Sequence, residues 1–420
     1  MWLYNLILIM VLLLSAPYWL VKLLFSRVWR VGFKQRLGFG CPVLQQPVIL
    51  LHAASVGEIR IAEILIKELK QRADPRPIVV SVLTPTGFTQ AQTRLNGLAE
   101  VVFAPLDLPF IVGRFMKKIN PVLLGVIETE LWPNLIVTAK NKGVKIILLN
   151  GRLSDRSYPT YQKIKILFRK IIRYFDYACV QTEEDKKRFM ALGLPPERLA
   201  VTSSVKYDFE IKLDVPAASI RQRYSFAPDD LIWVAGSTRN GEEAVLIKAW
   251  LDIRGKVPNL KLVLAPRHLK RINEIKKLLS NKAISFALSS QGHTGTPPFD
   301  CLLIDTMGEL LPAYSLADVV FIGGSLAQYG GQNILEPAAL AKPVVCGQDM
   351  RNFKEITSYL LAQKAIIQVH TLAELVENIV FLLTHKEAAR QMGIKARESL
   401  IAKKGAADKN VEAMERLLAE

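Results

Sequence analysis

The chain has 420 residues, half of them hydrophobic, with a mean hydropathy of +0.21 and a formal net charge of +17. This length is too great for one ordinary hydrophobic core and predicts about two domains. The charge calls for an anionic partner, but no basic–aromatic motif of the kind carried by RNA-binding sheets occurs, so nucleic acid is not expected. The four cysteines show no CxxC pairing, which is typical of a reducing compartment.

The first 25 residues, MWLYNLILIMVLLLSAPYWLVKLLF, contain no charge before Lys22 and are long enough to enter or cross a bilayer. A cleaved signal peptide is the competing interpretation, but it needs a basic start and a small-residue cleavage site. No Lys or Arg precedes the apolar run, and Pro17 directly follows Ser15 and Ala16. We therefore expect residues 1–25 to be an uncleaved membrane anchor.

A basic flank lies at the end of this segment and just beyond it. Its members, with no acidic residue among them, are Lys22, Arg27, Arg30, Lys34 and Arg36. An excess of Lys and Arg beside a membrane segment predicts that this side faces the cytoplasm. Such a cluster also attracts the head groups of anionic lipids. We expect the body of the protein to lie on the cytoplasmic face of a membrane.

Residues 26–210 alternate short β-rich runs with helical patterns. The first run, 47–53, is followed by a helical pattern at 59–72. Further strands are expected within 77–87, 100–107, 121–130, 144–151, 175–182 and 199–208. Strands that alternate with crossover helices form a parallel sheet, so this part is expected to be a Rossmann-like domain.

One segment of this half, YQKIKILFRKIIRYF at 161–175, predicts a basic amphipathic helix. Its apolar face consists of Ile164, Leu167, Phe168, Ile171 and Phe175. Two interpretations stay open. The helix lies against an acidic lipid surface, or it is an ordinary helix with a solvated charged face.

A polar linker is expected at 211–228, after which the alternating pattern restarts. Strands are expected within 231–243, 260–268, 299–310, 317–325 and 341–347. Residues 229–390 should form a second Rossmann-like domain, and the helical segment 391–420 should pack back on the first. The expected fold class is α/β, with two Rossmann-like domains facing a cleft.

Polar and glycine-rich motifs follow nearly every expected strand. In the first half they are HAASVGE (52–58), TPTG (84–87), ETELWPN (128–134), NGRLS (150–154) and SSVKYD (203–208). In the second half they are AGSTRNGEE (235–243), APRH (265–268), MGEL (307–310) and GGSLAQYGGQNILEPAALAKPVV (323–345). Open α/β sheets bind ligands at the carboxyl ends of their strands, so these motifs mark the expected sites.

Glu58 supports two interpretations. Ser55 and Glu58 have the spacing of a capping box, in which each side chain satisfies a backbone N–H of the other residue. Glu58 also lies at the junction between a strand and the helix that follows it, which is a usual place for a ligand site. The residue is therefore a structural cap, a catalytic carboxylate, or both.

The glycine-rich motif of the second half is expected to hold an anion. Gly323-Gly324-Ser325 and Gly330-Gly331 would leave backbone N–H groups open beside a helix that begins near Asn333. Glu336, one turn further, either accepts from sugar hydroxyls or stabilises the helix N-terminus. Neither GxGxxG nor a P-loop lysine occurs.

Phosphate charge is expected to be neutralised by side chains. No DxD motif occurs and the five histidines are scattered, so no metal ion or other cofactor is expected. Arg267, at the end of an expected strand, is the natural phosphate partner.

In this order, the motifs HAASVGE, ETELWPN, SSVKYD, APRH, MGEL and GGQNILEPAALAKPVV closely resemble those of the Kdo (3-deoxy-D-manno-octulosonate) transferases of lipid A and lipopolysaccharide biosynthesis. The resemblance covers nearly the whole chain. It implies a two-domain, metal-independent GT-B glycosyltransferase of Gram-negative bacteria. Such an enzyme moves Kdo from CMP-Kdo to a tetra-acylated lipid A precursor (lipid IVA), with inversion, at the cytoplasmic face of the inner membrane.

The resemblance also implies roles for individual residues. It assigns the general base to Glu58 and transition-state stabilisation to Glu128 and Lys206. It assigns the CMP contacts to Pro266, Arg267, Met307, Gly308, Glu309, Asn333, Ile334, Leu335 and Glu336.

Two alternative functions compete with this one. One is another GT-B enzyme that uses a UDP-sugar, such as a lipid-linked sugar transferase or a nucleotide-sugar epimerase. The other is a membrane-anchored, non-catalytic scaffold that binds lipid. The lack of a diphosphate-binding pattern disfavours the first, and the acids and glycines at successive strand ends disfavour the second.

Overall fold

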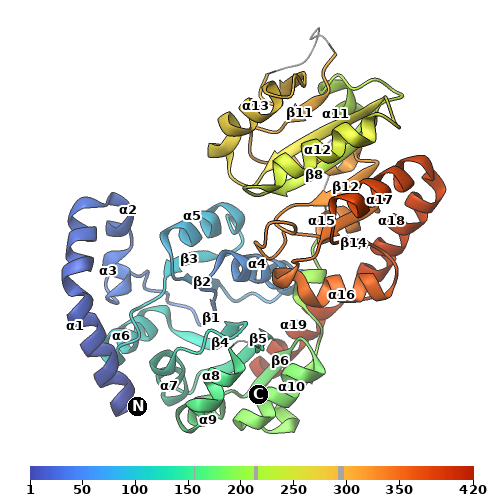
Figure 1. Ribbon diagram of the computed structural model, residues 1–420. Helices are drawn as coiled ribbons and strands as arrows, with labels where there is room; N and C mark the ends of the chain where they lie inside the picture. Colours follow the sequence, from blue (N-terminus) through green and yellow to red (C-terminus); the bar gives the residue numbers. More distant parts are fainter. Residues whose placement is uncertain (156, 212–215, 292–297) are drawn as a thin grey trace. The chain divides into compact units, whose positions relative to one another are not determined.

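The computed structural model describes residues 1–155, 157–211, 216–291 and 298–420. They form two compact units (Figure 1). Unit 1 contains Met1–Phe209 and Lys403–Glu420, and unit 2 contains Glu210–Ala402. The end of the chain therefore belongs to the same unit as its beginning.

Unit 1 is built on a seven-stranded parallel sheet with the strand order β3-β2-β1-β4-β5-β6-β7. The order runs outward in both directions from the neighbouring strands β1 and β4, which is the topological switch point of a doubly wound sheet. The strands are β1 (Val48–His52), β2 (Ile78–Val82), β3 (Glu100–Phe103), β4 (Pro121–Ile127), β5 (Lys145–Gly151), β6 (Tyr177–Val180) and β7 (Leu199–Val201).

Helices cover both faces of this sheet because successive strand side chains point to opposite sides. Leu50 and Leu124 lie in one apolar cluster with residues of α6, α7, α9 and α10, whereas Leu51 and Leu123 lie in another with α4 and α19. The helices of unit 1 are α1 (Trp2–Phe25), α2 (Arg27–Arg30), α3 (Phe33–Arg36), α4 (Val56–Gln71), α5 (Pro85–Arg94), α6 (Pro109–Ile119), α7 (Pro133–Asn141), α8 (Tyr158–Lys163), α9 (Lys165–Ile172), α10 (Glu183–Leu192), the 3₁₀ turns η1 (Pro196–Arg198) and η2 (Val205–Tyr207), and α19 (Ala406–Ala419).

Unit 2 repeats this architecture. Its seven strands are parallel in the order β10-β11-β9-β8-β12-β13-β14, with the switch point between β8 and β12. The strands are β8 (Leu231–Thr238), β9 (Leu260–Pro266), β10 (Phe286–Leu288), β11 (Cys301–Leu303), β12 (Val319–Ile322), β13 (Val344–Gly347) and β14 (Ile367–Val369). The helices are α11 (Ala217–Arg223), α12 (Glu242–Arg254), η3 (Leu269–Arg271), α13 (Ile272–Ser280), α14 (Leu310–Leu316), α15 (Leu335–Ala339), η4 (Arg351–Phe353), α16 (Lys354–Ala362), α17 (Leu372–Thr384) and α18 (Lys386–Ile401).

The expectation of two Rossmann-like parallel sheets and an N-terminal apolar helix is confirmed. Within the described chain, α1 is the one helix long and apolar enough to cross a membrane. All four cysteine side chains are buried and unpaired.

Three segments differ from the sequence-based expectation. Residues 212–215 of the expected linker lie outside the described residues, but 217–223 form α11 of unit 2, where the apolar side chain of Ile220 is buried. The segment 391–420 is not one helix, because α18 ends at Ile401 and Gly405, with φ +95°, precedes α19. A left-handed backbone of this kind suits glycine and interrupts a helix.

The basic segment 161–175 is also divided, since Ile164 has non-helical angles and separates α8 from α9. Ile164 is exposed, whereas Ile171 and Phe175 are buried in the core of unit 1. The apolar side of α9 is therefore used within the protein, which favours the interpretation as an ordinary helix.

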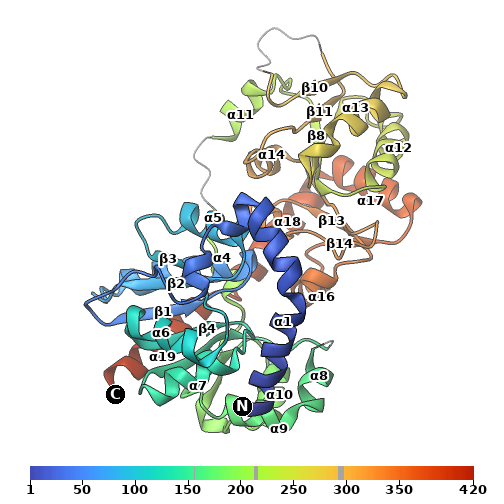
Figure 2. The same ribbon diagram turned by 90° about the vertical axis from the view of Figure 1, so that its left-hand side faces the viewer.

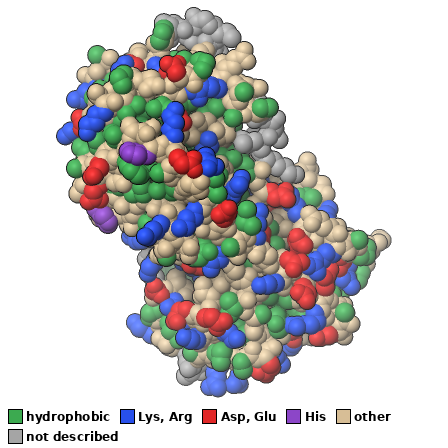
Figure 3. Space-filling model, turned by 90° about the vertical axis from the view of Figure 1, so that its right-hand side faces the viewer, with side chains coloured by type: hydrophobic (Ala, Val, Ile, Leu, Met, Phe, Trp, Pro, Cys, Tyr) green, Lys and Arg blue, Asp and Glu red, His purple; other side chains and the backbone are tan. Residues whose placement is uncertain are grey.

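Charged side chains of both signs are interspersed on the face drawn in Figure 3. The net charge is therefore not gathered into one large basic patch on that face.

Candidate active site

The switch point of unit 1 brings together two of the predicted catalytic residues. Glu58 belongs to the segment after β1, and Glu128 follows β4 directly. Because β1 and β4 are hydrogen-bonded neighbours, the segments at their carboxyl ends lie side by side. This is the position at which doubly wound sheets bind ligands.

Glu58 completes the capping box that its spacing predicts. Its backbone N–H donates to Ser55 Oγ at 3.3 Å, while its carboxylate accepts from the N–H groups of Ala54 at 2.6 Å and Ser55 at 3.4 Å. The Ser55 hydroxyl donates to the other carboxylate oxygen at 2.6 Å. The prediction of a helix cap is confirmed. All of these contacts are local, and within the described part of the chain the carboxylate forms no ion pair.

The surroundings of Glu58 change its acidity. Burial raises the pKa of this carboxyl to about 7, and the nearby negative charges of Glu130 and Glu128 act in the same direction. The hydrogen bonds from Ser55 and Ala54 oppose the rise. A carboxyl with a pKa near neutrality is suited to accept a proton at physiological pH.

Glu128 forms an ion pair with the third predicted residue, Lys206. The Lys206 ammonium group donates to Glu128 Oε1 at 2.8 Å, although the two residues are 78 positions apart in the sequence. Glu128 has φ +58°, a left-handed conformation that is uncommon outside glycine. Such strain is concentrated at functional sites, where the surrounding structure holds it in place.

Hydrogen bonds from two asparagines hold the turn that carries Lys206. Asn150 Oδ1, at the end of β5, accepts from the N–H of Val205 at 2.9 Å. Asn410 of α19 is buried, and its side chain accepts from the N–H of Asn150 at 3.1 Å and donates to Thr202 Oγ1 at 3.1 Å. The sequence motif NGRLS pointed to Asn150, but nothing local to Asn410 indicated its role.

Asp208 attaches the same turn to the start of α19. Its carboxylate accepts from the N–H of Gly405 at 2.6 Å and from that of Ala407 at 2.5 Å. Arg72 at the end of α4 pairs with Glu415 at 2.7 Å and with Asp408, both on α19. The C-terminal helix thus ties together the segments that carry Glu58 and Lys206.

His52 begins the HAASVGE motif but is part of the core. Its ring is fully buried, and Nδ1 lies 2.9 Å from Ser81 Oγ. Burial lowers the pKa of His52 to about 4, so the ring is neutral at physiological pH. Its edge packs against the Trp132 ring of ETELWPN at 5.4 Å. His52 therefore positions this motif rather than exchanging protons.

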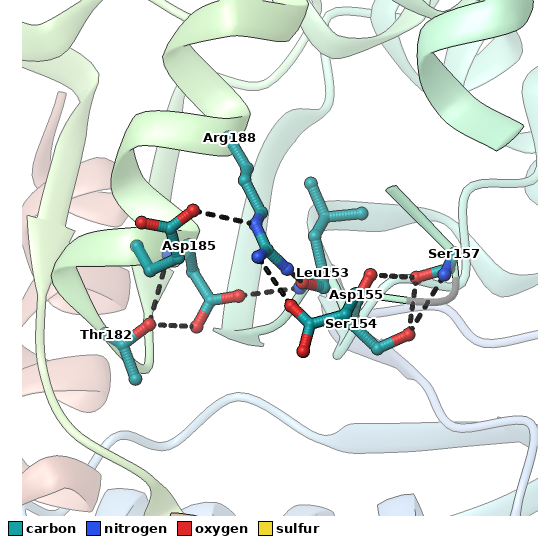
Figure 4. A network of polar contacts seen from close by, with 8 residues as sticks. Leu153, Ser154, Asp155, Ser157, Thr182, Asp185 and Arg188 are labelled. Carbon is teal, nitrogen blue, oxygen red and sulfur yellow. Dashed lines mark hydrogen bonds and ion pairs between the residues drawn. The ribbon is translucent and has the colours of Figure 1, made fainter. Parts of the chain in front are cut away.

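The loop after β5, which contains the NGRLS motif, is held by α10 (Figure 4). Asp185 accepts from the N–H of Leu153 at 2.7 Å, and Arg188 donates to the carbonyl of Leu153 at 2.5 Å. Arg188 also pairs with Asp155 at 2.6 Å. This network fixes the backbone of the loop that contains the NGRLS motif.

In unit 2, two arginines lie at the carboxyl ends of the adjacent strands β8 and β9. The N–H of Arg267 donates to the carbonyl of Thr238 at 3.0 Å, and the Arg267 side chain is exposed. Arg239 lies over the ring of Tyr329 at 4.4 Å and is 2.5 Å from His268 Nε2. Desolvation and the charges of Arg239 and neighbouring basic residues lower the pKa of His268. Arg239 was missed by sequence reasoning, although it stands inside the AGSTRNGEE motif.

Four of the five N–H groups that the sequence suggested would be open are engaged within unit 2, those of Gly323, Gly324, Gly330 and Gly331. Buried Glu242 accepts from the N–H groups of Gly324 at 2.6 Å and Leu326 at 2.9 Å, and Asp349 accepts from Gly330 at 2.8 Å. The N–H groups of Gly323 and Gly331 donate to backbone carbonyls. Buried N–H groups need partners, and carboxylates distant in the sequence supply them.

The residues of two predicted CMP motifs, MGEL and APRH, differ in exposure and in their contacts within unit 2. Glu309 precedes α14, and its carboxylate accepts from Arg223 at 2.8 Å and from the hydroxyl of Tyr224. Met307 is 81% exposed, and Gly308 has φ +90°. Pro266 is the last residue of β9 and is buried.

The remaining predicted contacts surround α15. The side chain of Asn333 accepts from the N–H of Leu335 at 3.1 Å, and Ile334 and Leu335 are buried. Glu336 lies in the first turn of α15, which begins at Leu335, near Asn333 as the sequence predicts. The predicted CMP residues lie at the last position of β9 or on the segments that follow β9, β11 and β12 in the chain.

Among the described residues, no group of three His, Cys, Asp or Glu side chains is arranged to hold a metal ion. Four positive groups surround His268 near the ends of β8 and β9: Arg239, Lys270, Arg267 and Arg271.

Comparison of the whole chain with known proteins gives consistent results. The family model described as 3-deoxy-D-manno-octulosonic-acid transferase (kdotransferase) matches residues 31–209. A 3-deoxy-D-manno-octulosonic acid transferase of Haemophilus influenzae is 35% identical over 383 residues, 90% of this chain and 89% of the relative. A transferase of the same name from Bordetella pertussis is 30% identical over 392 residues, 90% of each chain.

Solved structures agree on the fold. UDP-GlcNAc 2-epimerase from Neisseria meningitidis has a TM-score of 0.61 at 14% identity and covers 89% of this chain and 100% of its own. A glycosyltransferase from Rickettsia africae has a TM-score of 0.59 at 12% identity, with 89% and 99% coverage. These likenesses show the GT-B fold alone. Because the family model and sequence relatives that are 30–35% identical over 90% of the chain agree, the chain belongs to the 3-deoxy-D-manno-octulosonic acid transferase (Kdo transferase) family of glycosyltransferases.

Proposed function

We propose that this protein transfers Kdo from CMP-Kdo to the tetra-acylated lipid A precursor, lipid IVA, with inversion at the anomeric carbon and without a metal ion. Family membership supports the reaction class. The observation that carries the mechanism is the Glu58 carboxyl, whose pKa is raised to about 7 beside the Glu128–Lys206 pair.

Glu58 is the proposed general base. It takes the proton from the acceptor hydroxyl while that oxygen forms its bond to the anomeric carbon of Kdo. The bond from this carbon to the phosphate oxygen of CMP breaks, and CMP leaves with the electron pair. In the free enzyme, Ser55 and Ala54 hold the carboxylate in place through hydrogen bonds.

Glu128 and Lys206 are the proposed transition-state stabilisers. The Lys206 ammonium group offsets the negative charge of the Kdo carboxylate, and Glu128 orients that ammonium group through their 2.8 Å contact. A pre-positioned charge stabilises the transition state without reorganisation during the reaction.

In unit 2, the proposed CMP site uses Pro266, Arg267, Met307, Gly308, Glu309, Asn333, Ile334, Leu335 and Glu336. Arg267 neutralises the phosphate of the leaving CMP, and Glu336 accepts from ribose hydroxyls. We add Arg239 to this set because its guanidinium group stands at the end of the strand adjacent to Arg267. Two arginines at neighbouring strand ends suit a single phosphate.

The acceptor is a lipid, so the protein is proposed to act at the cytoplasmic face of the bacterial inner membrane. The apolar helix α1 and the basic residues that follow it would bind that membrane and its anionic lipids.

The proposal is tested by measuring Kdo transfer from CMP-Kdo to lipid IVA for the wild type and Glu58→Gln. Loss of the base is expected to lower the rate by about 10²–10⁴-fold, while the melting temperature changes little. Glu63→Gln, on the same helix but in an exposed ion-pair network with Lys67 and Arg94, serves as the matched control. An active Glu58→Gln variant that melts several degrees lower would reduce Glu58 to a cap.

A further inference from the structure

Helix α1 is attached to unit 1 at its N-terminal end. The hydroxyl of Tyr4 donates to Asp107 Oδ2 at 2.8 Å, and the side-chain N–H of Asn134 donates to Asn5 Oδ1 at 2.8 Å. Met1 packs against the apolar core of unit 1. Figures 1 and 2 both show this end of α1 beside α7. The beginning of the helix therefore contacts the folded unit directly.

The segment that follows α1 is attached to the same unit. Gln35 of α3 accepts from the N–H of Phe103 at 2.9 Å, and the carbonyl of Arg36 accepts from the N–H of Leu106 at 2.8 Å. The Arg36 guanidinium group also lies over the Phe103 ring at 4.4 Å. Both ends of the apolar segment are thus fixed to unit 1.

The surface of α1 is divided accordingly. The half-buried residues recur every three or four positions as far as Ala16 and return on the same side of the helix at Lys22 and Leu23. They form one stripe: Met1, Tyr4, Asn5, Leu8, Leu12, Ser15, Ala16, Lys22 and Leu23. The amide, serine hydroxyl and ammonium side chains of the helix all lie on this stripe. The other side is apolar and exposed along its whole length, with Leu14 80% and Phe25 83% exposed.

These contacts conflict with a helix that spans a membrane. Tyr4 and Phe25 are separated by about 30 Å along the helix axis, which equals the thickness of a bilayer core. In a spanning helix they would lie on opposite sides of the membrane. Tyr4 and Asn5 could then not reach Asp107 and Asn134 of a unit that also holds the segment after Phe25.

We infer that α1 lies in the plane of the membrane surface, with both ends on the side of unit 1 and its exposed apolar face among the lipid acyl chains. The polar side chains of the stripe have partners within the protein: Asn5 binds Asn134, Ser15 donates to a carbonyl of its own helix, and Lys22 lies over the Trp29 ring. The basic flank, with Arg30 and Lys34 exposed, faces anionic head groups. This inference rests on the membrane association proposed above and specifies its geometry.

The arrangement links the membrane to the candidate site. Asp107, which binds Tyr4, also accepts from the N–H groups of Asn134 at 3.0 Å and Leu135 at 2.8 Å, at the start of α7. Glu128 and Trp132 lie just before this helix in the chain. A helix lying in the membrane surface would therefore hold the segment that carries Glu128 close to a lipid-borne acceptor.

The test is the topology of the full chain in sealed membrane vesicles of a Gram-negative bacterium. One variant carries a protease-cleavable epitope ahead of Met1, and the matched variant carries it after Glu420, which follows α19 and reports the side of unit 1. Protease is added to right-side-out and to inverted vesicles. Both epitopes are expected to be cleaved from the same face, and cleavage from opposite faces would overturn the inference.

Two further outcomes separate this inference from the proposed function. If the chain does not sediment with the vesicles, α1 is not in lipid and the inference fails, whatever the transferase assay gives. Epitope cleavage does not need catalysis, so the topology is measured equally well on Glu58→Gln. An inactive enzyme with both ends on one face would refute the proposed function and leave the placement of α1 intact.

Discussion

Glu58 shows how one carboxylate serves two purposes. The hydrogen bonds from Ala54 and Ser55 complete a helix cap, and they also keep the carboxylate at the switch point of the sheet. Burial and the neighbouring acids make its proton easier to retain than that of an exposed glutamate. The cap and the proposed base are therefore compatible, since the same position satisfies the helix and raises the pKa.

The raised pKa predicts the pH dependence of the reaction. A base must be deprotonated, so kcat/KM for Kdo transfer should rise as the pH increases through about 7 and then level off. Below that pH the carboxyl holds its own proton and cannot accept another. The residual activity of Glu58→Gln should not show this rise of kcat/KM with pH. A wild-type kcat/KM that rises instead near the ordinary pKa of glutamate would contradict the assignment of Glu58 as the base.

The contact between Lys206 and Glu128 gives a second prediction. Lys206→Met removes the ammonium group and is expected to lower kcat by about 10²–10³-fold, because a pre-positioned charge is lost. The fold should be retained, since the Lys206 side chain is 38% exposed. Lys206→Arg should recover part of the rate. Lys67→Met, which breaks an exposed ion pair on α4, is the control and should leave the rate unchanged.

Helix α19 contacts the candidate site although it lies at the far end of the sequence. Buried Asn410 bridges Asn150 and Thr202, and Asp208 caps the helix from the turn that carries Lys206. The helix is therefore a structural brace for the candidate catalytic residues. Its apolar residues, such as Val411 and Met414, pack into the core of unit 1.

Replacement of Asn410 tests this role. Asn410→Leu leaves the buried N–H of Asn150 without its partner, removes the donor to Thr202 Oγ1, and is expected to cost about 2–4 kcal/mol of unfolding free energy. Denaturant titration measures the loss, and kcat should fall because the Lys206 turn loosens. Lys409→Ala, an exposed change on the same helix, should alter neither quantity. Equal stability of both variants would refute the bracing role.

The accuracy of the predicted elements followed their length and periodicity. The strands β1, β4, β8 and β9 are long and apolar, and the sequence located them. The strands β10 and β14 contain three residues each, too few for a periodic pattern, and they were missed. The strands β7 and β11 are equally short but lie within longer segments that were predicted as strands. The break at Ile164 was also missed, because the amphipathic pattern continues across it.

At the level of the two units, nucleotide binding gives the last prediction. CMP at about 100 times its Kd should stabilise unit 2 by about 2.7 kcal/mol, because a ligand that binds only the folded state shifts the unfolding equilibrium. Amide hydrogen exchange should show protection near the ends of β8 and β9, where Arg239 and Arg267 lie. Arg239→Leu should weaken the effect. UDP is the control, and equal protection by UDP would favour a UDP-sugar enzyme.

Local sequence carries strong information about this protein. The apolar runs, the Ser55–Glu58 spacing and the motifs at strand ends were enough to predict two parallel sheets, the helix cap and the family. Each of these depends on residues within a few positions of one another. Hydrophobic periodicity and capping act over that range, so they can be recognised without knowing the fold.

Contacts between distant residues required the folded chain. Lys206 meets Glu128 across 78 positions, and Glu242 accepts from the N–H of Gly324 across 82, which the sequence had suggested would be open. Tyr4 reaches Asp107 across 103 positions, which places α1 along unit 1. Such pairs are set by strand order and by which helix covers which face. The pKa of Glu58 belongs to the same class, because burial is a property of the assembled unit and not of the motif.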